Sequence, residues 1–265
     1  MTTRSSGFEH ISEAVNVPAE LGTERQATCA CGASFTQTHG MTQWVPPRCE
    51  ACRNAADEPW RAEQIESKRR QRLSALGVPP KYSGVSLETF TLHGDEENRK
   101  LQSRRLIAAR RYLADWPAVP EVIVFRGGPG TGKGHIAWSM AQELCRLHDV
   151  QVRVVKLADA VRDLREAWRS SEGLSEAQRL ERYRQPDLLV IDEVSRHAFY
   201  GEPHRHLYDL VDHRIEQCRP TLLTTNETVS GLEDLLQPAL TSRVAGVNMW
   251  DFGDVDYRLT KGRAA

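Results

Sequence analysis

The chain has 265 residues, enough for one sizeable domain and a small appendage but not for two domains of usual size. Apolar residues make up 40% and charged residues 27%, a balance that excludes a fully disordered protein. The 35 basic and 36 acidic residues give a net charge of −1, so no overall basic field attracts nucleic acid.

The N-terminal region carries no targeting signal that we recognise. Residues 1–22 are polar with weak periodicity, and we expect a flexible arm there without the apolar core of a signal peptide. No apolar run in the sequence approaches the roughly 18 residues that span a bilayer. We therefore expect a cytoplasmic protein with no membrane partner.

Residues 23–56 form a short, turn-rich segment with four clustered cysteines. They are Cys29, Cys31, Cys49 and Cys52, in the spacing C-x-C-x17-C-x2-C. In a reducing compartment such a cluster indicates a metal more than disulfides, and tetrahedral Zn²⁺ is satisfied by four thiolates. We predict a zinc-ribbon-like module built from two turn-borne pairs, with disulfides or free thiols as the alternatives. A module this small depends on the metal for its folding energy.

A charged stretch rich in alanine, glutamate and glutamine follows at residues 57–80, and its composition favours a helical linker. The sequence Gly77-Val78-Pro79-Pro80 ends it. We place the main domain at residues 81–265.

Helical and strand patterns alternate through residues 81–265. Amphipathic or helix-favouring segments cover residues 95–115, 134–148, 158–169 and 203–217. Short apolar segments rich in β-branched residues cover 121–126, 151–156, 187–191, 220–225 and 247–252. This alternation predicts an α/β fold, a parallel sheet with helices on both faces.

The clearest motif is the glycine loop GGPGTGK at residues 127–133. It fits G-x4-G-K and lies directly after a predicted strand and before a predicted helix, the context that identifies a Walker A loop. Glycines let backbone N–H groups surround phosphate oxygens, and the helix N-terminus adds a positive dipole end. The predicted nucleotide-binding residues of this segment are Gly128, Pro129, Gly130, Thr131, Gly132, Lys133, Gly134 and His135.

One position departs from the motif. The residue after Lys133 is normally Ser or Thr, whose hydroxyl binds Mg²⁺, but here it is Gly134. Thr131 lies too early in the loop to replace that hydroxyl, whereas a water can occupy the vacant Mg²⁺ coordination position. We therefore predict ATP binding with weaker dependence on Mg²⁺ and slow hydrolysis.

The segment DLLVIDE at residues 187–193 is an apolar strand that ends in two carboxylates. Strand C-terminal ends form the ligand crevice of open α/β sheets, so we expect Asp192 to hold Mg²⁺ and Glu193 to orient the attacking water. Neighbouring residues on a strand point opposite ways, but a turn at the strand end brings both to the site. The next strand ends at Asn226, which suits water positioning or, alternatively, a helix cap.

Five segments together resemble the DnaC/IstB-like family of AAA+ ATPases, which includes bacterial helicase loaders and transposition helpers. They are residues 127–135 (GGPGTGKGH), 187–194 (DLLVIDEV), 210–220 (LVDHRIEQCRP), 223–226 (LTTN) and 247–258 (VNMWDFGDVDYR). The resemblance extends from about residue 79 to the C-terminus. It implies an AAA+ P-loop domain, a three-layer α/β/α sheet without a separate lid domain.

The resemblance also implies partners and two further catalytic residues. Family members act on a DnaB-like replicative helicase hexamer, bind single-stranded DNA and self-associate with ATP. Arg243 matches the arginine finger and Arg258 the sensor 2 arginine, with a surface salt bridge as the alternative for each. DnaC itself has a helical N-terminal helicase-binding region without these cysteines, so the role of residues 1–60 stays open.

These features favour an ATP-dependent helicase loader with slow ATPase activity. Two alternatives remain: an IstB-like ATPase that helps a DNA transposase, and an adaptor that binds ATP without hydrolysing it.

Overall fold

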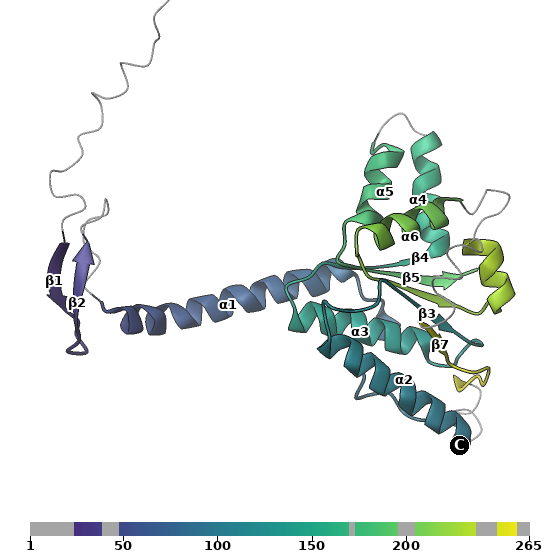
Figure 1. Ribbon diagram of the computed structural model, residues 1–265, viewed down its shortest axis with the longest axis horizontal. Helices are drawn as coiled ribbons and strands as arrows, with labels where there is room; N and C mark the ends of the chain where they lie inside the picture. Colours follow the sequence, from purple (N-terminus) through teal and green to yellow (C-terminus); the bar gives the residue numbers. More distant parts are fainter. Residues whose placement is uncertain (1–23, 39–47, 170–172, 196–204, 237–247, 259–265) are drawn as a thin grey trace, which may run out of the picture. The chain divides into compact units, whose positions relative to one another are not determined.

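The computed structural model describes residues 24–38, 48–169, 173–195, 205–236 and 248–258 (Figure 1). The chain divides into two compact units, Met1–Ser67 and Lys68–Ala265. One helix, α1 (Glu50–Leu76), contributes residues to both units and contains the predicted boundary at residue 56. Within the described ranges, no helix combines the length and the apolar character needed to cross a membrane.

The first unit contains a hairpin followed by the start of α1. Strands β1 (Glu24–Thr28) and β2 (Ser34–Thr38) pair antiparallel. Gly32 lies in the connecting turn with φ of +89°, a backbone conformation that glycine adopts freely. The prediction that both cysteine pairs lie on turns is wrong for the second pair, because Cys49 immediately precedes α1 and Cys52 lies in its first turn.

The second unit contains a five-stranded parallel sheet in the order β4-β5-β6-β3-β7. The strands are β3 (Val122–Arg126), β4 (Val152–Lys156), β5 (Leu188–Val194), β6 (Thr221–Thr225) and β7 (Met249–Asp251). Strands β3, β5 and β6 are buried on both faces, which explains their continuous apolar runs. The predicted parallel α/β sheet is confirmed, with small shifts at the strand ends.

Two helical layers enclose the sheet (Figure 1). Helices α2 (Glu96–Ala114) and α3 (Lys133–Leu147) pack on one face with the short 3₁₀ turn Pro80–Tyr82 nearby. Helices α4 (Leu157–Arg169), α5 (Glu176–Arg184) and α6 (Arg205–Glu216) pack on the other. Alternate strand residues therefore enter different cores: Ile123 packs on the α3 side and Val124 on the α6 side.

Helix α5 is absent from the sequence prediction. Its N-terminus has a capping box, in which the Ser175 hydroxyl accepts the N–H of Gln178 and the Gln178 side chain accepts the N–H of Ser175. This Ser-x-x-Gln pattern is a recognised start signal for a helix. The helix is short and strongly polar, so it lacks the apolar periodicity that revealed the others.

A fully buried arginine, Arg214, joins α6 to the starts of two strands. Its guanidinium donates hydrogen bonds to the hydroxyl of Thr221 and to four backbone carbonyls. Those carbonyls belong to Tyr183, Arg184, Pro186 and Pro220. Burial lowers the pKa of Arg214 to about 10, still far above neutral pH, so the group stays charged.

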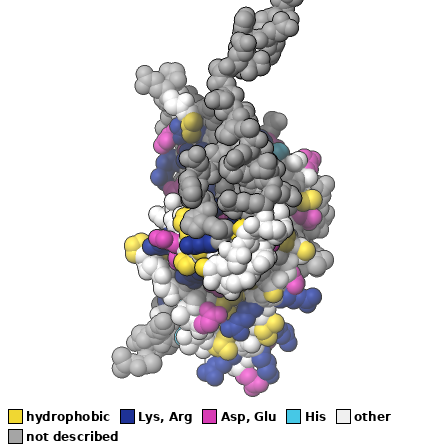
Figure 2. Space-filling view, turned by 90° about the vertical axis from the view of Figure 1, so that its left-hand side faces the viewer, with side chains coloured by type: hydrophobic (Ala, Val, Ile, Leu, Met, Phe, Trp, Pro, Cys, Tyr) yellow, Lys and Arg dark blue, Asp and Glu magenta, His cyan; other side chains and the backbone are white. Residues whose placement is uncertain are grey.

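The described surface mixes charges of both signs. In the face seen in Figure 2, lysine and arginine side chains are interspersed with acidic and apolar ones. This agrees with the near-zero net charge of the whole chain. No large field of one sign covers the described part of that face.

Candidate functional site

The glycine loop connects the C-terminal end of β3 to the N-terminus of α3, as the motif predicts. Gly130 and Gly132 have φ of +72° and +97°, which disfavours other residues. A Cβ on Gly132 would lie 2.7 Å from the Phe90 ring, and one on Gly130 would overlap the Asp256 carboxylate. The loop is therefore enclosed so closely that both positions require glycine.

Lys133 places its ammonium group inside the loop. Its Nζ donates to the carbonyls of Gly127 (2.7 Å) and Gly128 (2.6 Å) and lies 3.3 Å from the Thr131 hydroxyl. Burial lowers the pKa of Lys133 to about 8, an effect that Asp192 partly opposes. The loop thus concentrates positive charge where its N–H groups and the helix dipole already favour an anion.

The two predicted carboxylates lie on β5 in different environments. Asp192 is buried, whereas Glu193 is exposed and has a left-handed φ of +58°. Pairing between β5 and β6 shifts register between Ile191 and Val194, so the strand continues after an irregularity instead of ending at the carboxylates. The predicted turn therefore lies within the strand.

Thr224 on β6 joins the Asp192 side chain to the Glu193 backbone, a contact that the sequence analysis missed. Its hydroxyl donates to Oδ1 of Asp192 (2.5 Å) and accepts the backbone N–H of Glu193 (3.0 Å). Both bonds fix the Asp192 side chain and the strained Glu193 backbone. A polar residue inside an otherwise apolar buried strand was the available signal.

The Glu193 side chain is engaged by a lysine from the edge strand. Lys156, the last residue of β4, donates from Nζ to Oε2 of Glu193 at 2.8 Å. This hydrogen bond raises the pKa of Lys156. The Glu193 carboxylate is therefore held in an exposed ion pair.

Other predicted residues occupy varied positions. Asn226 follows β6 and is exposed, while Thr224 contacts the Asp192 carboxylate. His135 places Nε2 3.0 Å from the Ser86 carbonyl and its ring edge-on to Phe90, so it packs on the segment before α2. Arg243 lies outside the described residues.

Arg258 lies beside the glycine loop. It pairs with Asp256 at 2.7 Å, and the N–H of its neighbour Tyr257 donates to the Gly130 carbonyl at 3.3 Å. A cavity of about 200 Å³ opens here, lined in part by Phe90, Tyr257 and Arg258. The structure thus brings the predicted sensor arginine to the predicted phosphate site.

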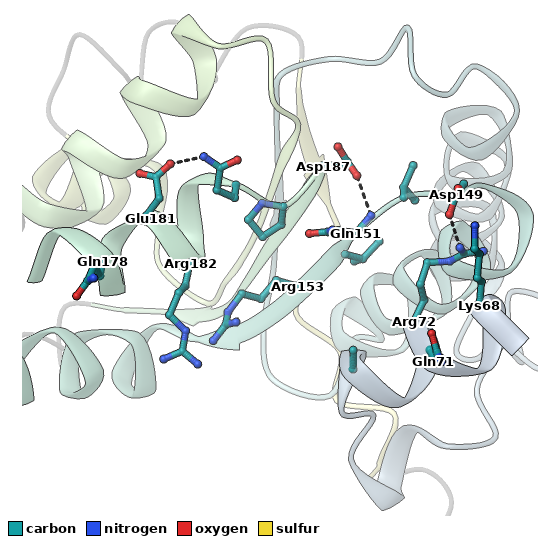
Figure 3. A pocket seen from close by; sticks show the side chains of 15 residues that line it. Lys68, Gln71, Arg72, Asp149, Gln151, Arg153, Gln178, Glu181, Arg182 and Asp187 are labelled. Atoms are coloured by element: carbon teal, nitrogen blue, oxygen red, sulfur yellow. Dashed lines mark hydrogen bonds and ion pairs between the residues drawn. The ribbon is translucent and has the colours of Figure 1, made fainter. Parts of the chain in front are cut away.

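A larger cavity of about 970 Å³ lies elsewhere (Figure 3). Figure 3 shows Lys68 and Arg72 of α1 on one side and Arg153 and Arg182 on the other. Its strand residues lie at the N-terminal end of β4, whereas the glycine loop follows the C-terminal end of β3. Since ligands of parallel α/β sheets bind at the C-terminal ends of strands, size does not identify the nucleotide site.

The four cysteines of the first unit converge as predicted. Their sulfur atoms all lie within 4.8 Å of one another, with Cys29 and Cys49 buried. Backbone N–H groups of Cys31 and Cys49 stabilise the Cys29 thiolate and lower its pKa. Four clustered thiols, one already favoured as thiolate, form a donor set that suits a tetrahedral metal ion.

The fold resembles those of several replication proteins. A DnaC helicase loader superposes with a TM-score of 0.53 at 17% identity, covering 65% of this chain and 99% of that chain. DnaI superposes with a TM-score of 0.51 at 17% identity, covering 66% and 90%. AMPPCP-bound DnaA from Aquifex aeolicus gives 0.51 at 20% identity, covering 65% and 50%. These similarities support the AAA+ fold.

Sequence relatives cover most of the chain. The replicative helicase loader DnaC of Escherichia coli K12 is 29% identical over 201 residues, 76% of this chain and 78% of that protein. The phage-like element PBSX protein XkdC of Bacillus subtilis is 24% identical, covering 81% and 77%. The family described as IstB-like ATP binding protein matches residues 64–244. The replicative helicase loader DnaC is among the relatives of this chain. The chain therefore belongs to the IstB-like ATP-binding protein family.

Proposed function

We propose that this protein is an ATP-dependent loader that places a DnaB-like replicative helicase hexamer on single-stranded DNA. The main support is the match to DnaC over three quarters of the chain. A glycine loop and two adjacent carboxylates also lie toward the C-terminal ends of β3 and β5. In this proposal the protein self-associates with ATP on the helicase and leaves after hydrolysis.

The proposed nucleotide chemistry uses groups already close to the loop. ATP phosphates replace the carbonyls of Gly127 and Gly128 as partners of the Lys133 ammonium. The Asp192 carboxylate, oriented by Thr224, suits a hard cation such as Mg²⁺. Bound Mg²⁺ neutralises charge on the phosphate oxygens. Arg258 stabilises the same charge, with Arg243 assigned to a neighbouring subunit's site.

Glu193 acts as the water-orienting base in this proposal, with Asn226 as a polar neighbour. The Lys156 ammonium holds the Glu193 carboxylate at 2.8 Å, a contact that restrains it from orienting a water. Breaking that exposed pair costs little, because such pairs contribute about 0–1 kcal/mol. A helicase or DNA partner can therefore release the glutamate and start hydrolysis.

The cysteine cluster is proposed to bind one Zn²⁺ through Cys29, Cys31, Cys49 and Cys52. Zinc would supply folding energy to a unit whose described strands are only five residues long. The folded module would then present a fixed surface to helicase or another replication protein.

The test is native mass spectrometry of the full chain with the replicative helicase of its own source, ATP and Mg²⁺. Several copies of this protein on each helicase hexamer, dependent on ATP, are expected. The Lys133→Ala variant, which retains the zinc module, should form no such complex. Failure of the wild type to associate in ATP would overturn the loader proposal.

Two other functions have specific support. The family description favours an ATPase helper of a DNA transposase, which would instead assemble on duplex DNA with ATP. Gly134 and the occupied Glu193 favour an adaptor that never hydrolyses ATP. Comparing phosphate release by the wild type and by Glu193→Gln, with DNA and helicase present, separates the adaptor from both ATPases.

A further inference from the structure

The Tyr82 hydroxyl lies close to Gly134, the position where a Walker A loop normally has Ser or Thr. A Cβ placed on Gly134 would lie 2.5 Å from the hydroxyl oxygen of Tyr82 and 3.3 Å from its Cζ. The Ser or Thr usual at this position carries its hydroxyl one bond beyond that Cβ. The Tyr82 hydroxyl therefore borders the space that the missing side chain would fill.

The direction of the Tyr82 ring brings this hydroxyl to the anion-binding end of α3. The ring stacks on Trp138, with centroids 5.3 Å apart and planes inclined by 22°. Gly134 and Trp138 lie one helical turn apart on the same face. The ring thus extends along that face from Trp138 toward Gly134, and its hydroxyl lies next to the helix N-terminus.

Several contacts fix Tyr82 in this position. Its carbonyl accepts a hydrogen bond from Nε2 of Gln142 (3.0 Å), and its N–H donates to the Pro79 carbonyl (2.8 Å). The Lys81 ammonium lies 4.5 Å from the ring centroid. Backbone hydrogen bonds and ring stacking already restrict the Tyr82 side chain. It therefore loses little further conformational entropy when its hydroxyl binds a ligand.

We propose that the Tyr82 hydroxyl takes the role of the usual Walker A Ser or Thr hydroxyl. It would contribute to binding the Mg²⁺ ion that accompanies the triphosphate. The role is taken by a residue 52 positions earlier in the chain, from the 3₁₀ turn Pro80–Tyr82. Arg258 lines the small cavity beside the same glycine loop. Gly134 is then required, because any larger side chain would displace the tyrosine.

This inference rests on the proposed ATP-binding function, and its test uses binding and not turnover. The dissociation constant of a fluorescent methylanthraniloyl derivative of ATP is measured in EDTA and across a Mg²⁺ titration. Tyr82→Phe should raise the Mg²⁺ concentration for half-maximal binding about tenfold and change binding in EDTA by less than about twofold. Tyr208→Phe, on α6 across the sheet, is the matched control and should match wild type.

A second pair of variants tests the shared space. Gly134→Thr alone should weaken Mg²⁺-dependent binding, because its Cβ collides with the Tyr82 hydroxyl. Adding Tyr82→Phe removes the colliding oxygen and supplies the threonine hydroxyl, so the double variant should recover to within about threefold of wild type. Thermal denaturation of each variant confirms that the fold is retained.

The outcomes separate the two levels of proposal. If wild type fails to bind the ATP derivative, the proposed function itself is wrong. If wild type binds with Mg²⁺ dependence and Tyr82→Phe behaves identically, only the role of Tyr82 is overturned. Tighter Mg²⁺-dependent binding by Tyr82→Phe would also overturn it, since the hydroxyl would then block the site. Failure of the double variant to recover would refute the exchange of hydroxyls.

Discussion

Replacing Arg214 by methionine should destabilise the second unit strongly. Methionine fills a similar volume but leaves four backbone carbonyls and the Thr221 hydroxyl without their buried donor. At roughly 1 kcal/mol for each carbonyl, less the desolvation cost of the guanidinium, the loss is about 3 kcal/mol. This is a large part of the 5–15 kcal/mol that is typical of a folded domain.

Urea denaturation followed by tryptophan fluorescence measures this loss, and a domain of this size should melt about 6–12 °C lower. Arg219→Met is the matched control, because Arg219 donates to the Gln185 carbonyl in the same segment but is only partly buried. It should lose less than about 1 kcal/mol. Equal losses in both variants would refute the argument that Arg214 satisfies otherwise orphaned carbonyls.

Four further predictions concern the two sites. ATP affinity should fall as pH rises through about 8, because Lys133 then loses its proton, and calorimetry in two buffers should detect proton uptake on binding. The free energy of unfolding should change with pH in the opposite direction to ATP affinity. Between pH 8 and the ordinary lysine pKa of 10.5, Lys133 is protonated in the unfolded chain but not in the folded one, so the free energy of unfolding should rise with pH. Lys156→Met should raise basal phosphate release several-fold by freeing Glu193. Cys49→Ser should abolish bound zinc, measured by mass spectrometry of the metal, while ATP binding persists.

The affinity, phosphate-release and zinc predictions each have a result that contradicts them. Constant affinity between pH 7 and 9 would mean that Lys133 does not titrate there. Unchanged release by Lys156→Met would mean that the ion pair does not restrain Glu193, with Glu193→Gln as the inactive control. Retained zinc in Cys49→Ser, or lost ATP binding, would exclude an independent four-thiolate site.

The parts that sequence predicts well are those encoded locally. The glycine loop and the strands around it depend on runs of adjacent residues, and the structure places them as expected. The Asp192-Glu193 pair lies on the expected strand, but the strand continues past it. The close approach of Cys29 and Cys52 follows from spacing together with the coordination preference of a metal.

The contacts that sequence does not predict depend on packing between distant segments. Thr224 meets Asp192 only because β6 lies beside β5 in one register. Lys156 reaches Glu193 across a strand pair, and Tyr82 reaches Gly134 through a stacked ring. Predicting these contacts requires the strand order and register, which no short motif contains.

The left-handed backbone conformation of Glu193 sets thermal stability against the proposed activity. A residue other than glycine in this conformation costs on the order of 1 kcal/mol. Glu193→Gly would relieve that cost, so this variant should resist heat better than the wild type while losing the proposed base. Selection for thermal stability alone would therefore disfavour this glutamate, and under the proposed function the domain accepts a small instability in exchange for its base.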